Sequence, residues 1–354
     1  MSRFFSEKYN TLVPYVPGEQ PQDRSYVKLN TNESPFPPSP LAVREAAGAA
    51  ATLQLYSDPE CHLLKEEFRR AYGVEKDRVL FSNGSDLLLN LAFMAFCDGE
   101  RGAAFPALSY GFYPVFAQIS CVPYTEIPLR ADFSIAPEDY VGLGKTIVIA
   151  NPNAPTGLAL GVEEIERIVR GNPDNVVVID EAYVDFGAES CLPLTERYDN
   201  LLVIQTFSKS RSMAGARLGF AVGDPALIAD LNAVKYSTDP YNVNRMTMAA
   251  GVGALRDEAY TRQNCRTIRE NRAFTARELK ALGFSMTESV TNFLFAAHPA
   301  ISGGELYREL KARGVLVRYF DRPDTRAYVR ITVGTMEQMR ILIDTIREIL
   351  EERT

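Results

Sequence analysis

The chemistry of this 354-residue sequence starts from two charged residues at the ends of apolar runs. Lys209 comes soon after Leu201–Gln205, and Asp180 directly follows Val176–Ile179. A lysine at a strand end can form a Schiff base with a carbonyl compound once its neighbours lower its pKa, although a lone lysine is more often a solvated surface group. A buried strand-end aspartate needs a cationic partner such as a pyridinium nitrogen; a helix N-cap or a metal ligand is the alternative.

Three other segments supply polar groups that suit a phosphorylated ligand. Arg217 and the hydroxyl of Ser208 flank the lysine. Gly84 and Ser85 stand where an apolar run gives way to a helix, and free N–H groups at a helix N-terminus bind phosphate. A rigid loop rich in Pro and Gly occupies residues 151–157. Taken one at a time, these segments also fit a surface cluster, a capped helix and an ordinary turn.

The combination is more informative than any one segment. The helix junction, the rigid loop, Asp180 and the Ser208–Lys209 pair each follow another apolar run, so one sheet edge would collect them. A Schiff-base lysine, a pyridinium partner and phosphate donors are the groups that pyridoxal phosphate requires. A nucleotide-hydrolysing site is excluded because the chain has no GxxxxGK[ST] motif. The set therefore predicts a site for pyridoxal 5'-phosphate.

The elements that must position these residues are buried strands. Four runs are apolar at nearly every position, which is typical of strands covered on both faces of a mainly parallel sheet. A helix near 161–170 is expected between the first two runs. We therefore predict an α/β/α sandwich for the large domain. The four runs are Thr146–Ala150, Val176–Ile179, Leu201–Gln205 and Leu218–Val222.

The remaining segments predict an N-terminal arm and a second, smaller domain. Prolines recur through residues 1–40, and proline is excluded from helix interiors and central strands. Beyond residue 245, a long helical stretch to Leu282 precedes an α+β unit that ends in an amphipathic helix at 335–352. We expect an arm at 1–30 that packs with the small domain, a large cofactor-binding domain at 31–245 and a small α+β C-terminal domain at 246–354.

Composition argues against several classes of function. Because 38 Lys and Arg oppose 45 Asp and Glu, the net charge is −7, and no broad basic surface is offered to nucleic acid or to an anionic bilayer. Five scattered cysteines without a CxxC pair, and only two histidines, argue against a metal site and a disulfide framework. No apolar run is long enough to span a membrane and no secretory signal is evident, so we expect a cytoplasmic protein.

In several short segments, given at the end of this paragraph, the chain resembles the fold-type I, class-II pyridoxal-phosphate aminotransferases. The resemblance is strongest to their histidinol-phosphate branch. The lysine and aspartate segments are shared across the superfamily, whereas the arm and two later runs are typical of the branch. The matching segments are LNTNESP at 29–35, YSDP at 56–59, NGSD at 83–86, DEAY at 180–183, SK at 208–209, PYNVN at 240–244 and VRITVG at 329–334.

The resemblance assigns roles to the cofactor-site residues. Lys209 would form the Schiff base and move the proton, Asp180 would hold the pyridine nitrogen, and Tyr183 would donate to the ring hydroxyl; these three are the expected catalytic residues. The ring would stack on Tyr110, and Tyr56 would reach the cofactor phosphate of a partner subunit, which implies a homodimer with shared sites. The expected phosphate contacts are Gly84, Ser85, Ser208 and Arg217, with Asp86 nearby as the helix cap.

The resemblance also assigns a substrate side to the site. Arg330 would fork onto the carboxylate of an amino acid, a task for a guanidinium rather than an ammonium group. Arg318 matches a position that pairs with a substrate phosphate, although it would also fit an ordinary exposed arginine at a strand end. The other expected substrate contacts are Tyr15, Asn32 and Tyr241.

One position departs from the family pattern. Family members usually carry Asn immediately before Pro-Thr-Gly, where it donates to the ring oxygen, and this chain has Ala154 there. Asn153 is the nearest substitute and is our expected contact, but a side chain one residue earlier should point in another direction. The departure affects this contact and leaves the fold prediction unchanged.

The implied activity is transfer of the amino group of L-histidinol phosphate to 2-oxoglutarate, giving imidazole-acetol phosphate and L-glutamate in histidine biosynthesis by a ping-pong mechanism. An aromatic amino-acid aminotransferase and a threonine-phosphate decarboxylase would share the cofactor site and differ in the distal pocket, which the sequence barely reveals. A non-catalytic regulator that senses the cofactor is disfavoured, because the arm leaves no room for a helix-turn-helix domain and the net charge is −7.

Overall fold

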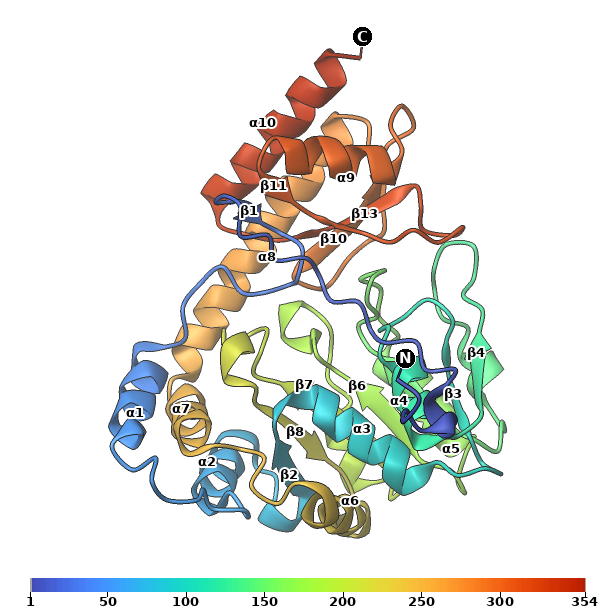
Figure 1. The fold of residues 1–354 in the computed structure, drawn as a ribbon, viewed down its shortest axis with the longest axis vertical. Helices are drawn as coiled ribbons and strands as arrows, with labels where there is room; N and C mark the ends of the chain where they lie inside the picture. Colours follow the sequence, from blue (N-terminus) through green and yellow to red (C-terminus); the bar gives the residue numbers. More distant parts are fainter. Residues whose placement is uncertain (1, 354) are drawn as a thin grey trace.

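The computed structural model describes residues 2–353, and its larger part is built on a seven-stranded sheet (Figure 1). The strand order is β2-β8-β7-β6-β5-β3-β4. Strand β8 runs antiparallel to both neighbours and the other pairs are parallel, so the prediction of a mainly parallel sheet is confirmed. The strands are β2 (Val79–Ser82), β3 (Ala103–Pro106), β4 (Tyr124–Ile127), β5 (Thr146–Ala150), β6 (Val177–Asp180), β7 (Leu201–Thr206) and β8 (Gly219–Val222).

Helices cover both faces of this sheet because its central strands are apolar on both faces. Along β5, Val148 and Ala150 pack into a core with α3, α4 and α6, whereas Ile147 and Ile149 pack against α5 on the other face. Near β2 and β8, the second face is covered by α2 and α7. This is the predicted α/β/α sandwich. The helices are α1 (Pro40–Ala50), α2 (His62–Tyr72), α3 (Gly84–Phe96), α4 (Tyr113–Ser120), α5 (Val162–Arg170), α6 (Pro225–Thr238) and α7 (Arg245–Arg256).

The smaller part is an antiparallel sheet covered by three helices, seen at the top of Figure 1. Its strand order is β12-β13-β10-β9, and a separate two-stranded sheet joins β1 to β11. Residues 315–319 form two short strands that belong to different sheets. The elements are β1 (Val27–Lys28), β9 (Ser285–Met286), β10 (Phe293–Ala297), β11 (Val315–Leu316), β12 (Arg318–Tyr319), β13 (Tyr328–Thr332), α8 (Glu258–Ala281), α9 (Gly303–Ala312) and α10 (Met336–Glu351).

The expected domain boundary at residue 245 needs correction. The predicted helical stretch breaks at Asp257, whose backbone is not helical, and this break separates α7 from α8. Helix α7 packs on the large part, where a Cβ added at Gly253 would lie 2.7 Å from the Cα of Ala42 in α1. Cys265 and Ile268 of α8 belong to the core of the small part. The two parts therefore meet at Asp257.

The N-terminal arm touches both parts of the molecule. Val27 pairs with Val315, and Glu19 accepts a hydrogen bond from Lys311, so this section of the arm lies against the small part. The preceding section lies against the large part, where the backbone N–H of Val13 donates to Gln118 at 3.0 Å. The arm therefore runs from one part to the other (Figure 1). Among the helices described, none is long and apolar enough to cross a membrane.

Candidate active site

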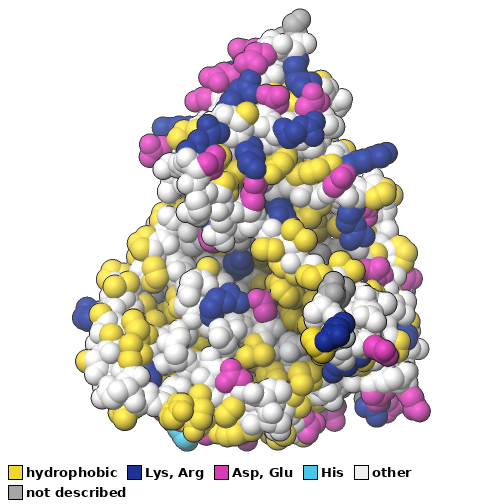
Figure 2. Space-filling model, in the orientation of Figure 1, with side chains coloured by type: hydrophobic (Ala, Val, Ile, Leu, Met, Phe, Trp, Pro, Cys, Tyr) yellow, Lys and Arg dark blue, Asp and Glu magenta, His cyan; other side chains and the backbone are white. Residues whose placement is uncertain are grey.

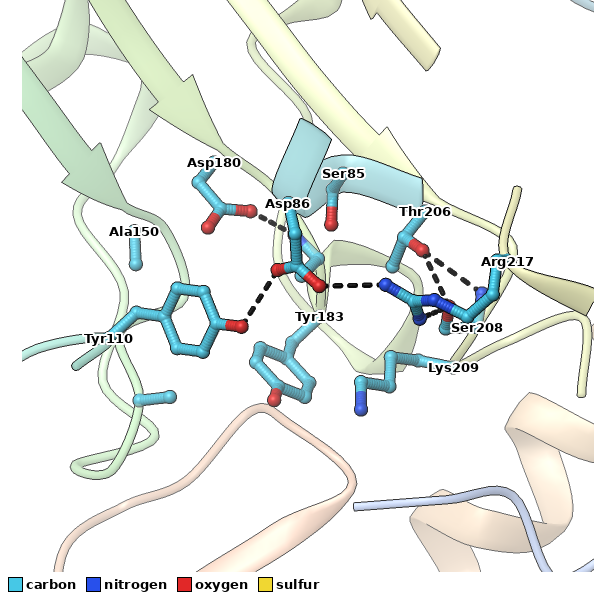
Figure 3. A pocket seen from close by; sticks show the side chains of 12 residues that line it. Ser85, Asp86, Tyr110, Ala150, Asp180, Tyr183, Thr206, Ser208, Lys209 and Arg217 are labelled. Atoms are coloured by element: carbon cyan, nitrogen blue, oxygen red, sulfur yellow. Dashed lines mark hydrogen bonds and ion pairs between the residues drawn. The ribbon is translucent and has the colours of Figure 1, made fainter. Parts of the chain in front are cut away.

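The sheet topology explains why the predicted residues converge. Strands β5, β6 and β7 are parallel, so their carboxyl ends meet at one edge of the sheet. The antiparallel β8 begins at this same edge, where Gly219 pairs with Thr206 and with Ser82 at the end of β2. A cavity with about 530 Å³ of empty space lies there, and Figure 3 shows the side chains that line it. Lys209, Asp180 and Arg217 all line this cavity.

One end of the cavity is shaped by glycines that allow close approach of the backbone. Gly84 has a φ of +78°, and a Cβ there would lie 2.6 Å from the Arg217 guanidinium. A Cβ at Gly219 would lie 2.6 Å from the backbone nitrogen of Ser85. Because α3 begins at Gly84, its first N–H groups lack intrahelical partners and are available to an anion. Backbone donors, a hydroxyl and a guanidinium therefore surround one small space.

Asp86 links this end of the cavity to its aromatic wall. One carboxylate oxygen pairs with Arg217 at 2.7 Å, and the other accepts a hydrogen bond from the Tyr110 hydroxyl at 2.7 Å (Figure 3). Burial and the neighbouring Asp86 raise the pKa of Tyr110, so its hydroxyl remains a donor. Asp86 therefore does more than cap α3, because it holds two other lining side chains in place.

Asp180 occupies the opposite end of the cavity. Its side chain is almost fully buried, and among residues 2–353 no lysine or arginine forms an ion pair with it. One oxygen accepts from the Tyr113 hydroxyl at 2.9 Å, and the other accepts from the Ala182 backbone N–H at 3.2 Å. Burial raises the pKa of the carboxyl from 3.8 to about 6. This end of the cavity therefore favours a cationic ligand group that would compensate the buried charge.

Lys209 lies between this cavity and a wider hollow next to it. Its Nζ donates to the Thr31 carbonyl at 3.3 Å and lies 5.8 Å from the centre of the Tyr183 ring. The Tyr183 hydroxyl accepts a hydrogen bond from the Asn32 amide at 3.0 Å. Both Lys209 and Tyr183 line the cavity and the hollow, so the amine can reach ligands in either space.

The hollow lies between the two parts of the molecule and has about 1440 Å³ of empty space, open to solvent. Figure 2 shows Lys and Arg side chains gathered in the middle of this face, below the small domain. Arg330 lines the hollow from β13, donates to the Asn30 carbonyl at 3.1 Å and keeps its buried Nε without a hydrogen-bond partner. A desolvated guanidinium with an unused donor is suited to binding an anion.

Arg318 and Tyr15 also line the hollow, but Arg318 already has partners. Its guanidinium donates to the carbonyls of Val16 at 2.8 Å and Pro17 at 3.0 Å, so it anchors the arm. Tyr15 stacks on Phe112 with ring centroids 4.2 Å apart. Burial raises the pKa of Tyr15 despite the two nearby arginines, so the hydroxyl stays protonated. Tyr15 of the arm and Arg318 of β12, which holds the arm in place, therefore line the same side of the hollow.

Two of the expected contact residues, Asn153 and Tyr241, do not line this chain's cavity or the hollow. Asn153 is buried, and its side-chain NH2 group donates to the Leu108 carbonyl at 3.0 Å and to the Thr156 hydroxyl. Its Oδ1 accepts a hydrogen bond from the Ser109 hydroxyl. Asn153 therefore holds the loops together, whereas Ala154 lines the cavity. Tyr241 lies outside this chain's cavity because the loop between α6 and α7 places it on the outer surface, stacked on Tyr56 at 4.7 Å.

Sequence reasoning missed Tyr113, which reaches Asp180 from the first turn of α4. The only available signal was its spacing, since it follows the predicted stacking residue Tyr110 by three positions. Such a spacing is equally typical of a tyrosine that packs in the core. Nothing in the sequence therefore indicated a hydroxyl directed at Asp180.

Comparison with known families decides what kind of site this is. The family model for aminotransferases of class I and II matches residues 24–346. The chain belongs to this family. Among its relatives, the histidinol-phosphate aminotransferase of Brachyspira hyodysenteriae is 44% identical over 99% of this chain and 100% of that protein. The histidinol-phosphate aminotransferase of Marinomonas sp. is 46% identical over 98% of this chain and 99% of its own.

Solved structures of the family share the fold. A putative histidinol-phosphate aminotransferase from Erwinia carotovora atroseptica has a TM-score of 0.86 at 26% identity, covering 93% of this chain and 97% of that one. The histidinol-phosphate aminotransferase of Sinorhizobium meliloti was solved in complex with pyridoxal-5'-phosphate. It has a TM-score of 0.85 at 22% identity, covering 94% of this chain and 93% of that one. The fold class and the family predicted from the sequence are thereby confirmed.

Proposed function

We propose that this aminotransferase uses pyridoxal phosphate to move the amino group of L-histidinol phosphate to 2-oxoglutarate. The observation that carries the proposal is the convergence of Lys209, Asp180 and Arg217 on one cavity, next to a hollow that is lined by Arg330. The substrate rests on relatives of 44% and 46% identity over nearly the whole chain, which carry the name histidinol-phosphate aminotransferase.

The residues present fit the cofactor. When bound, pyridoxal phosphate supplies an aldehyde that condenses with amines and a pyridinium ring that withdraws electrons. The buried Asp180, which has no cationic partner among residues 2–353, would hold the pyridinium N–H. Tyr110 and Ala154 line the space for the ring. The expected phosphate contacts are Gly84, Ser85, Ser208 and Arg217 at the opposite end.

The proton transfer falls to Lys209. Its Nζ faces both the cavity and the hollow, so the amine would take the proton from the substrate Cα and pass it to the cofactor carbon that is bonded to the transferred nitrogen. The Tyr183 hydroxyl, oriented by Asn32, would donate to the ring oxygen. With Asn153 committed to the loops, Tyr183 would serve that oxygen without the second donor that the family usually has.

The anionic end of each substrate would be held on the arginine side of the hollow. Histidinol phosphate has no carboxylate, so its phosphate would bind where glutamate places a carboxylate in the second half-reaction. Arg330, which lines the hollow and whose buried Nε has no hydrogen-bond partner, would make this contact through its guanidinium. Tyr15 would close the hollow from the arm, and Arg318 of β12 would hold the arm there through the carbonyls of Val16 and Pro17.

We also propose a homodimer that shares its active sites. The surface over α1, α2 and the loops beside them exposes several large apolar side chains, visible at the lower left of Figure 2. Tyr56 is 80% exposed and lines neither cavity of its own chain. A contiguous apolar surface of this kind is typical of an interface. The exposed apolar residues are Val43, Leu53, Leu55, Tyr56, Leu63 and Tyr241.

A cytoplasmic location is also part of the proposal. All five cysteines are unpaired, and four of them are buried. Free thiols of this kind are typical of proteins kept in a reducing compartment.

The proposal is tested by visible absorption of the purified protein with added pyridoxal phosphate. A band should form in the wild type and be absent from Lys209→Ala, which should also lose turnover. Separate titrations with L-histidinol phosphate, phenylalanine, threonine phosphate and glutamate then define the substrate. Bleaching at the lowest concentration by histidinol phosphate, together with bleaching by glutamate, supports the reaction. Bleaching that is strongest with phenylalanine would refute the substrate, and wild-type turnover in Lys209→Ala would refute the site.

A further inference from the structure

Tyr113 is a buried polar residue in contact with the cofactor site and without an assigned role. It is the first residue of α4 and is fully buried. Its hydroxyl donates to Oδ2 of Asp180 at 2.9 Å. Its ring meets Tyr110 edge to face, with centroids 5.7 Å apart and an interplanar angle of 85°. One side chain thus contacts the group expected at the ring nitrogen and the residue expected against the ring face.

We propose that Tyr113 is a positioning residue that keeps the Asp180 carboxylate ionised, so that the proton between Asp180 and the cofactor stays on the ring nitrogen. The inference rests on the proposed function of the site. A hydrogen bond donated to a carboxylate stabilises its charged form and makes it a weaker base. A carboxylate without this donor would compete more strongly for the proton, and the ring would lose the positive charge through which it withdraws electrons.

The surroundings support this role over a purely structural one. The other hydrogen bond to Asp180, from the Ala182 N–H, is longer at 3.2 Å. The neighbouring charges work against ionisation, since Asp86 and Glu181 both raise the pKa of Asp180. Burial and the adjacent Asp180 raise the pKa of Tyr113 well above its ordinary value, so its hydroxyl remains a donor. Tyr113 is therefore the main neutral donor that opposes the desolvation of this carboxylate.

The test compares Tyr113→Phe with a matched control. Phenylalanine keeps the ring that packs against Tyr110 and Phe105 and removes the hydroxyl alone. Tyr140 is also fully buried, but its hydroxyl has no hydrogen-bond partner, so Tyr140→Phe removes a buried hydroxyl without touching the site. Both variants are prepared without cofactor. They are titrated with pyridoxal phosphate and with 1-deazapyridoxal phosphate, in which carbon replaces the ring nitrogen.

The expected result is specific to the ring nitrogen. In Tyr113→Phe, the preference for pyridoxal phosphate over the deaza analogue should fall about tenfold, the usual size of a hydrogen bond to a charged group. The nitrogen-15 resonance of labelled cofactor should move toward that of an unprotonated pyridine. Tyr140→Phe should match the wild type in both measurements.

Three results would overturn the inference, and they are distinguishable. An unchanged preference and an unchanged resonance in Tyr113→Phe would mean that the hydroxyl does not act on the ring nitrogen. An equal loss of affinity for both compounds would mean that Tyr113 only supports packing. If the wild type bound the two compounds equally, Asp180 would not contact the ring nitrogen, and the proposed function, which depends on that contact, would fail as well.

Discussion

Replacing Asp180 with Asn should stabilise the cofactor-free protein at neutral pH, although it removes a group proposed to hold the cofactor. The side chain is only 5% exposed, and its charge has no ion-pair partner among residues 2–353. Burial raises the pKa of the carboxyl from 3.8 to about 6. At about 1.36 kcal/mol per pKa unit, this rise corresponds to about 3 kcal/mol of unfolding free energy.

The sign of the effect follows from proton binding. The folded protein holds the Asp180 proton more tightly than the unfolded chain does, so this contribution to stability is fully present below about pH 4 and is lost as the pH rises through about 6. Asparagine does not titrate, and its side-chain oxygen can still accept the Tyr113 hydrogen bond. The stability of Asp180→Asn relative to the wild type should therefore increase by about 2.5 kcal/mol between about pH 4 and pH 7.

The assay is urea unfolding of both cofactor-free proteins across this pH range at one protein concentration, because association would otherwise shift the midpoint. Asp98→Asn is the control, since Asp98 is exposed and the backbone N–H groups of Arg101 and Glu100 lower its pKa. That variant should show no gain as the pH rises. A difference between the wild type and Asp180→Asn that is the same at every pH would refute the argument.

Two further substitutions test the substrate side and the dimer. Arg330→Lys should lower kcat/KM for glutamate at least about tenfold, because an ammonium group cannot reproduce the bidentate contact of a guanidinium with a carboxylate. Unchanged steady-state kinetics would contradict the role of Arg330. Leu55→Glu places a charge at a residue that is 56% exposed, so the monomer should remain folded. Sedimentation should show that the dimer is lost, and activity should fall. A variant that stays dimeric would exclude this surface as the interface.

Several features of the fold and the site were predictable because they depend on local sequence. Runs such as Thr146–Ala150 and Leu201–Gln205 are apolar at nearly every position, which is typical of strands covered on both faces of a sheet. Charged groups directly after those runs, Asp180 and Lys209 among them, must lie at the strand ends. Parallel pairing then brings them to one edge of the sheet.

Other features required the tertiary structure. The sequence predicts one helical stretch after residue 245, and the break at Asp257 that sends α7 and α8 to different parts depends on which core each helix joins. The anchoring of the arm by Arg318 joins segments about 300 positions apart. Such contacts depend on how distant elements pack, which no local pattern encodes.

The sequence by itself determined the types of group in the site and the sheet edge that collects them. The tertiary structure decided which way each side chain points and what it meets. Asn153 turns into the loops and leaves Ala154 at the cavity, because neighbouring residues of a loop direct their side chains differently. The hydroxyl of Tyr113 meets Asp180 across 67 positions of chain, since α4 begins beside the end of β6. Side-chain identity is a property of the chain, whereas this contact exists only once the layers have packed.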